Sequence, residues 1–135
     1  MNKEKSAVRA LLDIQVGEPE KQQVMVPRLG LMITLRELPY NKLERLRGIE
    51  DADINYLLAS ADAPNFRDPV WYRDHMGCPT PVDAVKALLR PGEIRAIVRR
   101  CDLLNGYGLG AVISMDQTDL QDAAILAAME DLEKN

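Results

Sequence analysis

A proline in the middle of a long helical stretch constrains this chain more than any other residue. The stretch runs from Thr80 to Tyr107, and Pro91 interrupts it. Proline has no backbone N–H to donate and disfavours helical dihedral angles in the preceding residue, so a helix must end near Arg90. Proline also suits the first position of a helix, and Glu93 in the first turn complements the helix dipole. The stretch therefore predicts two helices joined by a very short break.

Both predicted helices have defined ends and one apolar face each. Thr80 is a good N-cap for the first helix, with Asp83 in the position of a capping-box acid. Asn105-Gly106 ends the second, and Tyr107 is expected to fold back as a hydrophobic contact. Apolar residues recur at helical spacing in both segments: Val82, Val85, Leu88 and Leu89 in the first, and Ile94, Ile97, Val98, Cys101 and Leu104 in the second. The two helices are expected to pack in the core, and their pattern indicates no catalytic or binding chemistry.

The N-terminal part of the chain predicts a short helix followed by a β-hairpin. Residues 6–12 predict the helix, with Val8, Leu11 and Leu12 facing inward. Apolar residues then alternate with polar or exposed positions at Val24 and Val26 and at Leu31, Ile33 and Leu35. Residues 27–30 can turn the chain, which predicts two antiparallel strands. Because an isolated hairpin is marginal, its apolar face needs a helix to cover it. Its edges also offer backbone groups to a strand from a partner or a second copy.

Several shorter helices are predicted around this framework. One begins at Pro39 and ends at Gly48, with Leu43 and Leu46 inward. Asp51 or Asp53 caps the next. Its apolar stripe is Ile54, Leu57, Leu58 and Ala61, and residues 62–68 form a loop. Asp68-Pro69 opens a further short helix that carries Trp71, Tyr72 and Met76 and ends at Gly77. Thr118 and Gln121 form a capping box for a last helix that reaches about Leu132.

These elements predict a mainly α fold within the α+β class. We expect a compact helical domain with one small antiparallel β-hairpin near the N-terminus. The predicted organisation has a mobile N-terminal segment with a short helix (1–20), a hairpin plus helical core domain (21–110), and an acidic amphipathic C-terminal helix (111–135). A chain of 135 residues suits one domain with a modest core.

The overall composition favours a cytoplasmic protein. No apolar run approaches the roughly 20 residues needed to cross a bilayer, and the N-terminus lacks the apolar region of a signal peptide. Cys78 and Cys101 are expected to be reduced thiols, with Cys101 in the core. The net charge of −4 argues against general binding of nucleic acid.

The residues that could carry chemistry lack the partners that chemistry needs. His75 is the single histidine, and only Asp74 and Cys78 lie near it, without a second pair of metal ligands. The nucleophile candidates, Ser60, Ser114 and the two cysteines, have no second histidine to serve as a base. The glycines at 106, 108 and 110 follow a helix, whereas a dinucleotide-binding loop must follow a strand. We therefore predict a non-enzyme with no catalytic, metal or cofactor-binding residues.

A helix-turn-helix DNA-binding regulator is an alternative interpretation of the paired helices. In that arrangement the second helix would enter the major groove, with Arg95, Arg99 and Arg100 as the reading residues. A Pro-Gly break in place of a three- to four-residue turn argues against it. A solvated basic face that meets an acidic surface is the simpler interpretation.

Three segments carry a likeness to a known family. They are APNFRDPVWYRDHMG, CPTPVDAVKALLRPGEI and the closing LLNGY. The residues that match the family pattern are Thr80, Pro81, Leu88, Leu89, Pro91, Gly92, Glu93, Ile94, Gly106 and Tyr107, with Asn105 where the family usually has serine. The chain resembles the XkdN-like phage tail assembly chaperones over residues 24–107.

The resemblance implies a non-enzymatic assembly factor. Such chaperones bind the long, helical tape measure protein, help the tail tube protein polymerise around it, and are absent from the finished virion. The resemblance leaves open whether the chain also associates with itself. One hypothesis is that the acidic helix from Asp119 to Leu132 orders on the tape measure protein as an arm, and the other is that it packs on its own domain. Besides the DNA-binding regulator, a structural adaptor of a phage tail is the remaining alternative.

Overall fold

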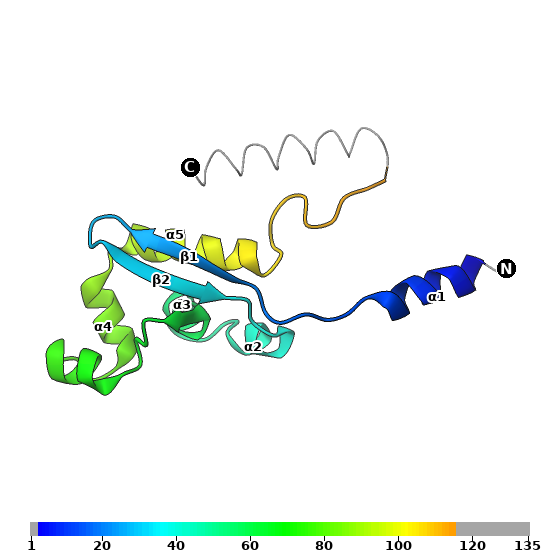
Figure 1. The fold of residues 1–135 in the computed structure, drawn as a ribbon. Helices are drawn as coiled ribbons and strands as arrows, with labels where there is room; N and C mark the ends of the chain where they lie inside the picture. Colours follow the sequence, from blue (N-terminus) through cyan, green and yellow to red (C-terminus); the bar gives the residue numbers. More distant parts are fainter. Residues whose placement is uncertain (1–2, 116–135) are drawn as a thin grey trace.

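The computed structural model describes residues 3–115, which form a small sheet covered by helices (Figure 1). The predicted α+β class with its antiparallel strands near the N-terminus is confirmed. In chain order the elements are α1 (Lys3–Asp13), β1 (Lys21–Val26), β2 (Leu31–Arg36), α2 (Tyr40–Arg45), α3 (Ala52–Ser60), β3 (Ala61–Ala63), the π-helix η1 (Val70–His75), α4 (Pro81–Leu88) and α5 (Pro91–Leu104). None of the helices in these residues is long and apolar enough to cross a membrane.

The sheet has three antiparallel strands in the order β1-β2-β3. The predicted hairpin is confirmed as β1 and β2, in which Val24 pairs with Ile33 and Met25 with Met32. The prediction of a helical Ala61 followed by a loop is wrong, because Ala61 pairs with Leu35 in a third strand. The chain itself thus satisfies the backbone groups along one edge of β2. Strand β1 is left as an outer strand of the sheet.

The core lies between one face of this sheet and the helices α3, α4 and α5. Figure 1 shows α3 and α5 on the same side of β1 and β2. The alternation of the strands supplies the sheet side of the core, and the helices supply the other side at helical spacing. The buried core residues are Val26, Ile33, Leu35, Ile54, Leu57, Leu58, Phe66, Val85, Leu89, Ile94, Ile97 and Cys101. Apart from Ala61, the apolar stripes predicted for the three helices are therefore confirmed.

The break at Pro91 is confirmed in detail. The Thr80 hydroxyl accepts a hydrogen bond from the Asp83 backbone N–H at 3.2 Å, so α4 begins with the predicted cap. Helix α4 ends at Leu88, and α5 begins at Pro91. The backbone N–H of Arg90 donates to the Glu93 carboxylate at 2.7 Å, which caps the second helix.

Glu93 also fastens the hairpin turn to the start of α5. Arg28, in the turn between β1 and β2, donates through Nε and Nη2 to the two Glu93 carboxylate oxygens at 3.0 and 2.7 Å. The same guanidinium donates to the carbonyl oxygen of Leu88 at 3.0 Å. The hydrogen bonds from Arg28, and then the one from the Arg90 backbone, lower the pKa of Glu93 to about 2. An ion pair with two parallel hydrogen bonds fixes the relative orientation of the two side chains as well as pairing their charges.

This depressed pKa predicts an acid-sensitive contribution to stability. A carboxyl whose pKa is lower in the folded state contributes stability that is present above its ordinary pKa and is lost as the pH falls towards the folded value. We expect Glu93→Gln to lower the melting temperature at pH 6 by about 5 °C. The difference in melting temperature between wild type and variant should become smaller as the pH falls from 5 to 2.5. Thermal denaturation at each pH measures this. Glu18→Gln, in the exposed linker before β1, is the control and should follow wild type at every pH. A constant Glu93→Gln deficit down to pH 2.5 would contradict the assignment.

The backbone at the end of α5 follows the prediction. The N–H of Gly106, at a φ of +88°, donates to the Leu103 carbonyl at 3.1 Å, and the N–H of Tyr107 donates to that of Asp102 at 2.9 Å. This is the paired helix end that a glycine permits. The side chain of Tyr107 is 58% exposed, and it lines a shallow pocket together with Leu43 and Leu46. Its hydroxyl hydrogen-bonds to Arg47, whose pKa it raises.

Two further expectations need correction. Asp51 stands at the N-terminal end of α3 but in a left-handed conformation, with a φ of +53°, and its side chain makes no capping hydrogen bond. Its carboxylate pairs with Lys86 of α4 at 2.9 Å, so it ties two helices together. The short helix after Pro69 is present, but as the wide π-helix η1, and Trp71 packs edge-on against Phe66 with ring centroids 5.4 Å apart.

The C-terminal region is described only in part. Residues 108–115 are not helical, as their glycines predict. The predicted helix from Thr118 to about Leu132 lies outside the described residues.

Candidate interaction surfaces

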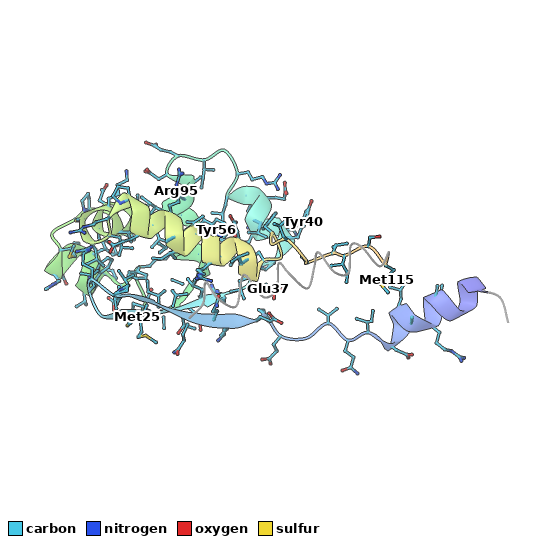
Figure 2. The ribbon with its side chains drawn as sticks, turned by 90° about the horizontal axis from the view of Figure 1, so that it is seen from above. Met25, Glu37, Tyr40, Tyr56, Arg95 and Met115 are labelled. Atoms are coloured by element: carbon cyan, nitrogen blue, oxygen red, sulfur yellow. The ribbon has the colours of Figure 1, made fainter. Side chains whose placement is uncertain are left out.

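Helix α1 stands apart from the rest of the fold in both views (Figures 1 and 2). The residues that the sequence placed inward are exposed: Val8 by 52%, Leu11 by 68% and Leu12 by 78%. That expectation is wrong, because the exposed residues 14–20 lead from α1 to β1 and keep the helix away from the sheet. Isolated helices shorter than about 12–15 residues are marginal in water, and most of their stability comes from packing an apolar face. An 11-residue amphipathic helix in this position therefore gains stability from any surface that covers it.

The apolar surface continues beyond α1 into the linker. Ile14 is 67% exposed and Val16 is 99% exposed. Together with Val8, Leu11 and Leu12 they form what we call the N-terminal apolar arm. Arg9 and Asp13 lie on other sides of the same helix and leave the apolar stripe uninterrupted.

A second apolar surface lies on the outer face of the sheet. Met25 and Met32 are directly paired across β1 and β2, and they are 54% and 50% exposed. Figure 2 shows Met25 pointing away from α5, on the side of the strands that the helices leave uncovered. Methionine is flexible and polarizable, and surfaces that bind varied apolar partners use it often.

A groove runs between β1 and one side of α5. It encloses about 240 Å³ and is lined by Val24, Met25, Val26, Pro27, Glu93, Ala96, Ile97 and Arg100. The lining residues of α5 are three or four positions apart, so they form a single side of the helix. The groove is apolar along most of its length, and Arg100 brings a positive charge into it.

A third set of exposed apolar residues follows α5. Leu109 is 71% exposed, Val112 is 92% exposed and Met115 is 81% exposed. Figure 2 shows Met115 well away from the sheet and α5. Exposed apolar residues gathered in this number are typical of surfaces that meet a partner.

The structure does not assemble the metal or catalytic sites that the sequence had considered. Asp74 accepts a hydrogen bond from its neighbour Arg73 at 3.3 Å, and the Cys78 thiol donates weakly to the Met76 carbonyl at 3.6 Å. Within residues 3–115 there is no group of three His, Cys, Asp or Glu residues placed to hold a metal ion, and His75 is part of none. Ser114 is exposed in the segment after α5.

Ser60 and Cys101 are core residues rather than nucleophiles. Both side chains are fully buried. Burial raises the pKa of the Cys101 thiol to about 11, so the thiol stays protonated. The Ser60 hydroxyl has no hydrogen-bond partner of good geometry among the described residues, and the neighbouring Cys101 thiol offers it only a weak contact. Both cysteines are free thiols, as predicted.

The glycines and arginines that suggested nucleotide or DNA binding have other places in the fold. Gly106 forms the end of α5, and Gly110 takes a left-handed conformation at a φ of +90° in the segment beyond. Arg95 and Arg99 are exposed on α5, while Arg100 is half-buried beside the groove. Only two residues separate α4 from α5, which is shorter than the turn of a helix-turn-helix.

Sequence reasoning missed the groove and the exposure of α1. The open edge of β1 was anticipated, but the spacing of Ala96, Ile97 and Arg100 on the side of α5 beside it was not used. The signal for an exposed α1 was the polar stretch just before β1 and in its first residues, from Glu18 to Gln23.

Comparison with known proteins supports the fold. No protein-family model matches the chain, and no curated protein matches it. The chain is similar to the crystal structure of the protein YqbN, with a TM-score of 0.55 and 16% sequence identity. The match covers 68% of this chain and 89% of YqbN. At this identity the similarity extends to the fold alone.

Proposed function

We propose that the protein is a phage or prophage tail assembly chaperone of the XkdN-like type. In this role it binds the tape measure protein in the host cytoplasm, assists tail tube assembly, and leaves before the virion is complete. It performs no reaction and needs no cofactor. The observation that carries the proposal is the N-terminal apolar arm, an amphipathic helix displayed outside the fold with its apolar side exposed by half or more.

The chemistry of the proposed client suits such a surface. A tape measure protein is long and helical, and its apolar surface needs cover until the tube subunits enclose it. An amphipathic helix binds an apolar helical partner by packing residues at i, i+3 and i+4 into its grooves. Val8, Leu11 and Leu12 have this spacing and are already free of contacts with the core. The resemblance over residues 24–107 supports the same function independently of the arm.

Co-expression with the tape measure protein encoded beside this chain tests the proposal. The wild-type chain should keep the tape measure protein soluble and co-purify with it. Replacing Val8, Leu11 and Leu12 with serine should reduce the captured amount at least tenfold, because three central apolar contacts are lost. Arg9→Ser combined with Asp13→Ser changes other sides of the same helix and should capture as much as wild type.

Two outcomes would contradict the proposal at different levels. Failure of the wild-type chain to capture the tape measure protein would remove the chaperone function. Equal capture by the wild type and the triple serine variant would leave the function in place but move the client surface away from the arm. Binding to DNA duplexes that weakens with salt and is lost in Arg95→Ala with Arg99→Ala would instead favour the DNA-binding alternative.

A further inference from the structure

The groove between β1 and α5 has the features of a site for one amphipathic helix. Its walls are the outer strand of the sheet and the side of α5 that carries Ala96 and Arg100. Among its lining residues Val26 and Ile97 are buried, whereas Ala96 is exposed. An apolar side chain placed there would cover surface that water now reaches, which favours binding.

The charge of the groove indicates which charge its occupant should carry. The carboxylate of Glu93 is already held by Arg28, at 2.7 Å, so it contributes little net charge. Arg100 then leaves the groove positive. A positive, partly apolar groove prefers a segment that is apolar on one side and acidic on the other.

The chain contains a segment with this chemistry. Residues 116–135 include six acids, Asp116, Asp119, Asp122, Glu130, Asp131 and Glu133, against one base, Lys134. Ile125, Leu126, Met129 and Leu132 recur in the same segment at the spacing of one helix face. The segment therefore matches the groove in both polarity and charge.

The connection is long enough to bring the segment to the groove. The chain from Asn105 to Met115 can span up to about 36 Å when extended. Helix α5, with its 14 residues, is about 21 Å long. A segment that follows Met115 can therefore lie alongside any part of α5. A short tether also gives it an effective concentration in the millimolar range, well above that of a separate molecule.

We propose that the groove between β1 and α5 is a docking site for the chain's own acidic segment, residues 119–132. The apolar residues of the segment enter beside Ala96 and Val24, and its acids face Arg100. Docking covers the side of α5 next to the outer strand and so blocks that edge to a second copy. This inference does not depend on the chaperone function, because it concerns the free protein.

Disulfide trapping in the full-length chain tests the docking. In a Cys78→Ser background, Ala96→Cys is combined with Ile125→Cys or with Met129→Cys and oxidised with oxidised glutathione. A disulfide forms only when the two Cα atoms come within about 7 Å. At least one pair should form an intramolecular bond, at a rate independent of protein concentration. Ala87→Cys, at an alanine of α4 that is also exposed, should form the disulfide at least tenfold more slowly with either partner.

Charge reversal adds a second readout. Arg100→Glu should slow trapping in the Ala96→Cys variants at least fivefold at low salt, with little difference at 1 M salt. Arg95→Glu is the matched control, because Figure 2 shows Arg95 on the side of α5 away from β1, and it should trap like the parent. Equal trapping at positions 87 and 96, no trapping at either, or a bond only between two chains would overturn the proposal. The last result would make a second copy the occupant.

Discussion

Replacing Leu57 with alanine is expected to lower the free energy of unfolding by about 3 kcal/mol, the largest effect of any single truncation proposed for this chain. Leu57 lies in the middle of α3, is fully buried, and belongs to the cluster that joins the sheet to α4 and α5. Truncation to alanine loses the favourable free energy of burying three carbon atoms. It also leaves a cavity that the rigid strands cannot close. Urea denaturation followed by circular dichroism measures the change.

Leu12→Ala is the matched control for this substitution. The chemical change is the same, but Leu12 is 78% exposed on α1. We expect the free energy of unfolding to change by no more than about 0.5 kcal/mol, as for other surface substitutions. A Leu12→Ala loss close to that of Leu57→Ala would show that α1 is part of the core, and it would remove the basis for an arm. Comparing the two leucine variants therefore distinguishes a leucine that packs in the core from one that is available to a partner.

The parts of the fold that sequence reasoning predicted well depend on local chemistry. Thr80, Pro91 and Gly106 set the ends of α4 and α5 through rules that involve only a few neighbouring residues. The strands of the hairpin also follow from alternation within six residues each. In these elements the backbone preference and the burial pattern agree, so the outcome could be derived without a structure.

The errors occurred where distant segments compete for the same residue. Ala61 has the spacing of the α3 stripe, yet β2 offers it an unpaired edge, and the strand pairing prevails. Asp51 suits a cap, yet Lys86 from α4 takes its carboxylate. Val8, Leu11 and Leu12 predict a buried face, but periodicity does not say which molecule buries it. For the same reason the groove could not be predicted, since its two walls are about 70 residues apart in the sequence.

Asn105 is expected to show the second largest effect, through hydrogen bonds rather than packing. Its side-chain oxygen accepts from the Leu38 backbone N–H at 2.8 Å, and its amide donates to the Tyr56 hydroxyl and to the Cys101 carbonyl, both at 2.9 Å. One side chain thus links the end of α5 to α3 and to the segment after β2. Asn105→Ala should lower the free energy of unfolding by about 2 kcal/mol, because the half-buried Leu38 N–H loses its partner. Asn41→Ala, at an exposed asparagine of α2, is the control in urea denaturation and should stay within about 0.5 kcal/mol of wild type.

A double-mutant cycle with Tyr56→Phe separates the hydrogen bond between the two side chains from the rest of the loss. Burial, more than any other factor, raises the pKa of Tyr56, and a hydrogen bond to Asp102 raises it further, so the hydroxyl stays protonated and can accept from Asn105 while donating to Asp102. Residues that share such a network should show a coupling energy of about 1 kcal/mol, with the double mutant less destabilised than the sum of the single mutants. Strict additivity would mean that Asn105 acts through Leu38 and Cys101, without a contribution from Tyr56. Serine has a shorter side chain and no amide group, so it cannot make all of the hydrogen bonds that Asn105 makes. Asn105→Ser should therefore lose the coupling to Tyr56 while retaining part of the stability that Asn105→Ala removes.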